Sequence, residues 1–177
     1  MKYTEKVHST VMNAVKEMQK LDKLKADAQK NFAGDRLKTE LETIFKQREQ
    51  VRQDAQATVE ACRAAYKAAV EKGTELDGSM LTDDAKILSS GIVLSAHQFS
   101  ALVEKHRNNP LMTGLLKQYQ NKHEGLYVDF VPSADAKITE FNGFCNTARS
   151  VLYNENGMQT AFFESGRCTP GICTENE

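Results

Sequence analysis

The sequence predicts an all-α protein: a long antiparallel helical hairpin of coiled-coil type, then a small helical domain and an irregular C-terminal tail. Glycine and proline number only 10 and 3 among 177 residues, fewer than the many turns of a β fold require. Apolar residues recur about every 3.5 positions along most of the chain, which is the helical period. We expect the hairpin in residues 1–73, the small helical domain in 80–153 and the tail in 154–177.

The first helix is predicted between Thr4 and Phe32. Its apolar residues are spaced alternately four and three positions apart, which is the narrow stripe of a coiled coil. Lys25 occupies the one position of the stripe that is not apolar. The stripe consists of Val7, Val11, Ala14, Met18, Leu21, Ala28 and Phe32.

A second helix is predicted to end at Gly73. Gly34 suits the left-handed residue that ends a helix, and Asp35 suits the N-cap of the next. The five residues from Phe32 to Leu37 rotate the apolar face by about 140°. A reversal at Gly34 explains this offset, and one long bent helix is the alternative. The second stripe consists of Leu37, Leu41, Ile44, Arg48, Val51, Ala55, Cys62, Tyr66 and Ala69.

This second arm would be about 55 Å long, which exceeds the width of a compact domain of this size. Its stripe is rich in alanine, which buries little apolar area. We therefore expect the hairpin to pair with another copy, with a different protein or with the C-terminal half of the chain.

The C-terminal half carries clear helix-start signals after the linker "KGTELDGSM". Ser95 followed by Gln98 forms a capping box, and Asn109-Pro110 places proline at a first helical position. The last helix begins after Pro132 and presents an apolar face. That face consists of Ile138, Phe141, Phe144 or Cys145, Ala148 and Leu152.

Several polar residues could be taken for metal ligands or for a phosphate-binding loop, but each has a simpler structural interpretation. Asp83 and Asp84 follow a capping Thr82, where the helix dipole favours negative charge. His97, His106 and His123 lack the spacing of metal-binding motifs, so we interpret them as structural or surface residues. The linker motif G-x₄-G-S lacks the lysine of a phosphate-binding loop.

The four cysteines fall into two pairs. Cys62 and Cys145 lie in helical apolar patterns and are expected to pack as small hydrophobic side chains. Cys168 and Cys173 flank "TPGI" near the C-terminus. A zinc site needs a second ligand pair, which the sequence lacks. An ordinary tail, a disulfide under oxidising conditions and a metal site remain open for these two residues.

The sequence contains no recognisable catalytic machinery. There is no nucleophile elbow, no glycine-rich βα turn and no pair of E-x-x-H motifs. We therefore expect a non-enzyme without cofactor or metal. No apolar run approaches the roughly 18 residues of a membrane span, and the N-terminus lacks a signal-peptide core. We expect a cytoplasmic protein.

The segment from Leu81 to His123 resembles small helical proteins of tailed phages and prophages of Gram-positive gut bacteria. The similar features are the "LS-x₂-x-F" helix start, the "KHRNNPLM" turn and the "LLKQYQNKH" helix. The resemblance covers about a quarter of the chain. It implies a phage or mobile-element origin and the cytoplasm of a host cell, and it transfers no catalytic residues.

Two classes of function fit these observations. The first is a non-catalytic protein that occupies a host partner, such as an anti-CRISPR-type inhibitor of an effector nuclease. The second is a virion-assembly or scaffold protein. Nucleic-acid binding is a third, weaker interpretation, because the net charge is only -1 and the basic residues form no concentrated stripe.

We expect the partner to be a protein, with a host nucleic-acid-processing complex as one candidate and a second copy bound through the coiled-coil arm as another. Neither a membrane nor a small-molecule substrate is expected. The candidate binding residues are those of the polar face of the hairpin and an aromatic pair in the tail. They are Lys16, Lys20, Lys23, Arg36, Arg48, Arg52, Phe162 and Phe163.

Overall fold

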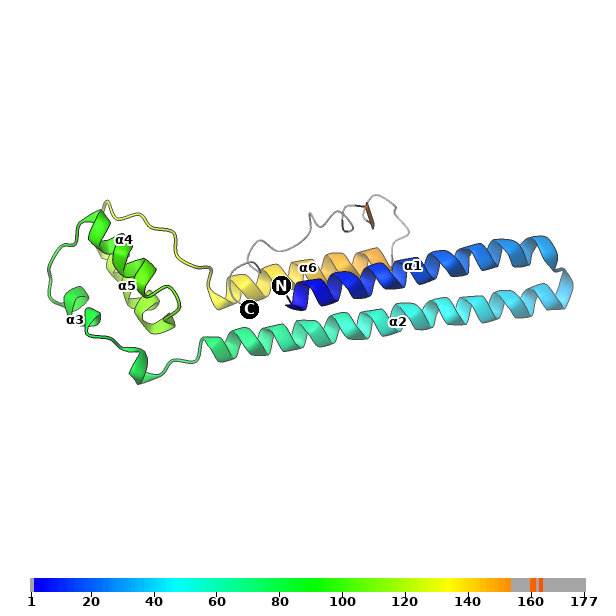
Figure 1. The fold of residues 1–177 in the computed structure, drawn as a ribbon, viewed down its shortest axis with the longest axis horizontal. Coiled ribbons are helices and arrows are strands. Elements are labelled where there is room, and N and C mark those ends of the chain that lie inside the picture. Colours follow the sequence, from blue (N-terminus) through cyan, green and yellow to red (C-terminus); the bar gives the residue numbers. More distant parts are fainter. Residues whose placement is uncertain (1, 154–159, 162, 164–177) are drawn as a thin grey trace. The chain divides into compact units, whose positions relative to one another are not determined.

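The computed structural model describes residues 2–153, 160, 161 and 163. Every regular element in this part of the chain is a helix, which confirms the all-α prediction (Figure 1). None of these helices combines the length and the apolar content that crossing a bilayer requires. The elements are α1 (Lys2–Asn31), α2 (Gly34–Gly73), the 3₁₀ helix η1 (Gly78–Met80), α3 (Asp84–Ser89), α4 (Ala96–Lys105), α5 (Pro110–Lys122) and α6 (Ala134–Tyr153).

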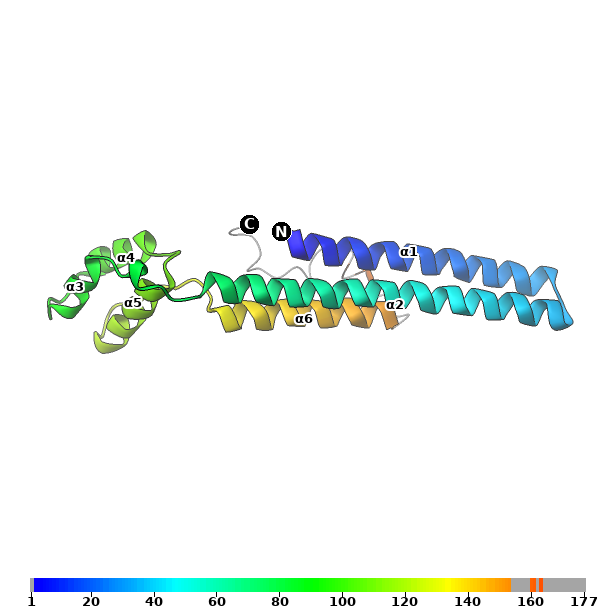
Figure 2. The ribbon, with the colours of Figure 1, turned by 90° about the horizontal axis from the view of Figure 1, so that it is seen from below.

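The chain reverses direction between α1 and α2, which confirms the antiparallel hairpin (Figures 1 and 2). Gly34 has φ 59°, the left-handed conformation that favours glycine. Across the turn, Leu21 and Ala28 of α1 share a buried cluster with Ile44 of α2. Asp35 lies within the first turn of α2, whereas the sequence suggested that it precedes the helix as its cap.

The helix α6 packs on the hairpin as its third helix. Buried residues of α1, α2 and α6 form one core, in which Val11, Val59 and Ala148 are each almost fully enclosed. The helix runs antiparallel to α2 (Figure 2). Cys62 and Cys145 lie in this core as free, buried thiols, as expected.

The compact units of the chain differ from the expected division at residues 73, 80 and 153. The chain forms two compact units, one containing residues 1–68 with the chain from Asp135, and one containing Ala69–Ala134. The linker before residue 80 favours a single domain over residues 80–153 when the sequence is taken alone. The large apolar face of α6 is instead buried against the two long helices, because their alanine-rich stripe encloses little area by itself.

The second unit contains η1, α3, α4 and α5. The predicted capping box is present at the start of α4, and Asn109 with Pro110 begins α5 as predicted. The core of this unit is a smaller cluster around Phe99, whose ring stacks on Tyr119 at a centroid distance of 5.8 Å.

The tail expected in residues 154–177 lies outside the described residues, except for Thr160, Ala161 and Phe163. The expectations for Phe162, Cys168 and Cys173 therefore also lie outside them. Phe163 is fully buried in the core of the first unit, between the ring of His8 at 5.2 Å and the ring of Phe144 at 5.4 Å.

Candidate protein-interaction groove

One stripe of α2 extends along most of the hairpin. Its members are separated by three or four residues, so they lie on one face of the helix. The stripe consists of Leu41, Phe45, Arg48, Arg52, Gln56, Val59, Arg63 and Tyr66.

The C-terminal part of this stripe is covered by α6. The ring of Tyr66 stacks on Phe141 at a centroid distance of 4.2 Å. One turn away, the guanidinium of Arg63 donates to the side-chain oxygen of Asn146 over 2.7 Å. These contacts define the face of α2 on which the third helix rests.

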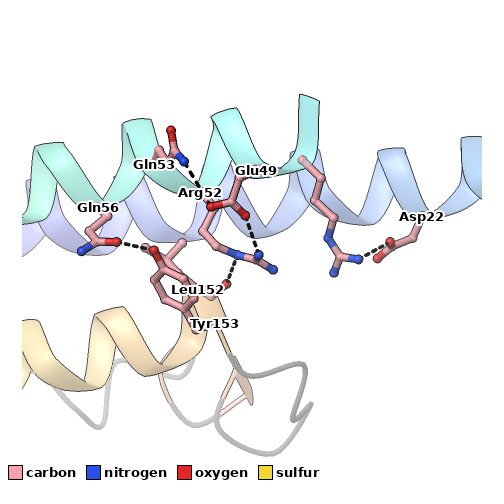
Figure 3. A network of polar contacts seen from close by, with 8 residues as sticks. Asp22, Glu49, Arg52, Gln53, Gln56, Leu152 and Tyr153 are labelled. Atoms are coloured by element: carbon pink, nitrogen blue, oxygen red, sulfur yellow. Dashed lines mark hydrogen bonds and ion pairs between the residues drawn. The ribbon is translucent and has the colours of Figure 1, made fainter. Parts of the chain in front are cut away.

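The coverage ends at Arg52 (Figure 3). Its Nε donates to the backbone carbonyl of Leu152 over 3.0 Å, and its Nη1 pairs with Glu49 over 3.0 Å. Beside it, the hydroxyl of Tyr153 donates to the side chain of Gln56. Because the last carbonyls of a helix have no partner within the helix, Arg52 satisfies one of them where α6 ends.

Beyond Arg52, none of the helices in the described part of the chain covers the same face of α2 (Figure 3). Here α1 and α2 form a groove of about 380 Å³. Phe45 lies on the stripe that α6 covers further along, yet it is 69% exposed. The surface of the hairpin on which α6 packs therefore continues toward the turn, and no described residue packs on it there. The lining residues are Asp22, Lys25, Leu41, Glu42, Ile44, Phe45, Lys46 and Arg48.

Charges of both signs surround the apolar part of the groove. At its α6 end, Arg48 of α2 forms an ion pair with Asp22 of α1 over 3.0 Å. Glu42 and Lys46 line it one helical turn apart on α2, and Lys25 lines it on α1. The groove therefore has an aromatic and aliphatic floor with a mixed-charge rim, an arrangement also found in protein interfaces.

The three lysines predicted as binding residues lie on the surface. Lys16, Lys20 and Lys23 are all exposed on α1, and Lys20 pairs with Glu17 over 2.6 Å. None of the three lines the groove. The guanidinium of Arg36 lies over the ring of Phe32 at 4.3 Å, beside the turn of the hairpin.

The other predicted binding residues of the described chain hold the fold together. The side chains of Arg48 and Arg52 are only 19% and 17% exposed, because both bridge between helices. Phe163 is enclosed in the core and cannot touch a partner from that position. The sequence placed Arg48 within the apolar stripe and named both arginines as binding candidates, but it could not show that each contacts another helix.

A second polar cluster lies in the other unit, where the sequence suggested only capping. The carboxylate of Asp84 contacts His106 Nε2 over 2.6 Å and Lys105 Nζ over 2.7 Å. His106 is buried. Hydrogen bonds from Lys105 and then from His106 hold the pKa of Asp84 below its usual range. The three residues join the start of α3 to the end of α4.

The described residues contain no group of three or more His, Cys, Asp or Glu side chains arranged to hold a metal ion. Burial raises the pKa of the Cys145 thiol, against the opposing effect of a hydrogen bond with Arg63. A raised pKa disfavours the nucleophilic thiolate.

Sequence reasoning missed Phe45, although a signal for it existed. Phe45 lies four residues after Leu41 and seven before Arg52, so the three residues share a face. The second apolar stripe predicted from the sequence contains Ile44 and not its neighbour Phe45. Phe45 was therefore given neither a core nor a binding role. No protein-family model, curated protein or solved structure matches the chain.

Proposed function

We propose that this chain is a non-catalytic protein-binding protein whose binding element is the groove between α1 and α2. The ligand is an amphipathic helix that takes the third position of the bundle, in line with α6. The observation that carries this proposal is the 69% exposure of Phe45 on the face that α6 covers elsewhere.

The energetic argument rests on the floor of the groove. Full burial of a phenylalanine or leucine side chain is worth about 1.5–3 kcal/mol. Phe45 is largely exposed and Leu41 partly so, which leaves apolar area available for an incoming side chain. Helix-in-groove recognition uses this arrangement, with anchors at i, i+3 or i+4, and i+7 of the ligand.

The length of the groove suits a helix. The residues of α2 that line it extend from Leu41 to Arg48, corresponding to roughly 10 Å. A ligand helix of about two turns would cover that length, which matches anchors at i, i+3 or i+4, and i+7. The end of α6 contacts Arg52, one helical turn beyond Arg48, so a ligand would approach from the side of the hairpin turn.

The expected inhibitor of a host effector nuclease and the expected virion-assembly protein both act by occupying a protein surface. Both are compatible with this groove and stay predictions. They differ in the occupant, because an inhibitor binds a different protein, whereas an assembly protein also binds copies of itself. Identifying what lies against Phe45 therefore separates the two.

The test is site-specific photo-crosslinking. We would replace Phe45 with benzoylphenylalanine in the full chain and irradiate it both as pure protein and in a Gram-positive cell extract. The matched control carries the same group at Thr43, which is exposed on α2 but does not line the groove. We expect a discrete adduct from position 45 and little from position 43. Equal labelling at both positions, or none, would contradict the proposal.

A further inference from the structure

We infer that the helix that fills the groove is acidic, with an aromatic anchor on Phe45 and carboxylates on both sides of it that pair with Lys25 and Lys46. This inference rests on the proposed function of the groove and names the chemistry of the partner. Two observations support it: the way α6 packs on the same stripe of α2, and the charges that lie on either side of Phe45.

The apolar part of the partner follows from the existing contact between α2 and α6. The stripe of α2 that contains Phe45 also contains Tyr66, and the ring of Tyr66 stacks on Phe141 of α6 at 4.2 Å. Phe45 offers a similar ring on the part of the stripe beyond α6, with Leu41 beside it in the groove. An aromatic side chain of the partner therefore stacks on Phe45 as Phe141 stacks on Tyr66.

Lys25 borders Phe45 on the α1 side of the groove. Its position follows from the ion pair between Asp22 of α1 and Arg48 of α2. Lys25 lies three residues after Asp22, and Phe45 lies three residues before Arg48. Because α1 and α2 are antiparallel, both steps lead about one turn closer to the turn of the hairpin (Figure 2). Lys25 and Phe45 therefore lie at a similar level, and both line the groove.

Lys46 borders Phe45 on the opposite side. Successive residues of a helix are about 100° apart, so Ile44 and Lys46 point to opposite sides of Phe45. Ile44 is buried against α1, in a cluster with Leu21. Lys46 is exposed and lines the groove on the side away from α1. The exposed ring of Phe45 thus lies between two lysines that come from different helices.

The charges of these two lysines are available to a partner. In the part of the chain that the structure describes, neither Lys25 nor Lys46 forms an ion pair, whereas the charge of Arg48 is already paired. Glu42 also lines the groove, but it lies one helical turn nearer the turn of the hairpin than Lys46. The partner is therefore acidic at the level of Phe45, and a basic residue suits it one turn further along.

The experiment compares two peptide probes that bind to the full chain, with fluorescence anisotropy as the measurement. Both are helix-stabilised, alanine-based peptides of about three turns with the same phenylalanine and leucine anchors. One has glutamate at the positions that flank the anchors, and the other has lysine there. We expect the glutamate probe to bind about fivefold more tightly or better, and added salt to reduce the difference. The whole chain has a net charge of -1, so its overall charge does not favour an acidic probe.

Two double variants test whether the groove selects the charge. Lys25→Glu with Lys46→Glu should reverse the preference, so that the lysine probe binds more tightly. Lys16→Glu with Lys23→Glu is the matched control, because it makes the same change of charge at exposed residues of α1 that do not line the groove. The control should keep the preference for the glutamate probe. Circular dichroism verifies that both variants remain helical.

The acidic partner and the proposed function fail differently. Equal binding of the two probes, lost in Phe45→Glu, overturns the acidic partner and leaves the apolar groove standing. A preference that both double variants abolish equally also overturns it, because charge outside the groove then selects the probe. Binding of neither probe overturns the acidic partner, while a discrete crosslink from position 45 still supports the groove. Binding of neither probe, with no such crosslink, overturns both.

Discussion

The Nε of Arg52 donates a hydrogen bond to the backbone carbonyl of Leu152 over 3.0 Å, joining two residues a hundred positions apart. This contact fastens the end of α6 to α2 (Figure 3). It also marks the point where the covered face of α2 gives way to the open groove. The same arginine therefore joins α2 to α6 and lies one helical turn from the groove residue Arg48.

Replacing Arg52 with alanine should lower the free energy of unfolding by about 1.5–3 kcal/mol, the range for a hydrogen bond that involves a charged group. The control is Lys20→Ala on α1, whose surface ion pair should be worth less than about 1 kcal/mol. Urea denaturation of the two variants measures the difference. Equal stabilities would show that Arg52 does not hold α6.

The turn of the hairpin depends on the left-handed conformation of Gly34. Gly34→Ala should destabilise the protein by about 1–2 kcal/mol, because a Cβ is disfavoured at φ 59° although nothing crowds it there. Gly143→Ala is the control in α6, where the same open surroundings lack the positive φ. It should stabilise by about 0.5–1 kcal/mol. Thermal unfolding shifts of the same sign would contradict this account.

The hydroxyl of Tyr119 stabilises the segment before α4. It donates to the carbonyl of Ile92 over 2.7 Å and accepts from the backbone N–H of Leu94 over 2.9 Å. Tyr119→Phe leaves that buried N–H without its partner, so we expect a loss of about 1–3 kcal/mol. Amide hydrogen exchange at Leu94 should accelerate accordingly. Tyr127→Phe, at an exposed tyrosine, should change neither quantity.

The cluster of Asp84, Lys105 and His106 should make the second unit sensitive to acid. Lys105 and then His106 lower the pKa of Asp84 in the folded state. A lowered folded pKa stabilises the fold above the ordinary aspartate pKa of about 3.9, and the stabilisation disappears as the pH falls through the lowered value.

Asp84→Asn should therefore destabilise α4 at neutral pH and reduce the loss of stability below about pH 4. Removing the carboxylate leaves the buried His106 without its charged partner. Asp83→Asn is the neighbouring control, because Asp83 forms only a surface pair with Lys86. Hydrogen exchange of residues 96–105 from pH 3 to 7 follows the effect. Identical pH profiles for the two variants would contradict it.

Local features of the sequence determined the helices and their ends. The apolar period predicted α1 and α2, and glycine at position 34 predicted the reversal because few other residues adopt its φ. Ser95 with Gln98, and Asn109 with Pro110, predicted the starts of α4 and α5. These signals can be recognised without the fold because each acts within about one turn of the chain.

The tertiary structure alone decided which helix covers which face. It moved α6 from the small domain to the hairpin, and it changed Arg48 and Arg52 from a candidate binding face into contacts between helices. It also left Phe45 exposed where α6 ends. Burial depends on pairs of segments far apart in the sequence, and the periodicity of one segment does not specify its partner. The groove exists because α6 is shorter than the hairpin it rests on, a relationship that no local pattern contains.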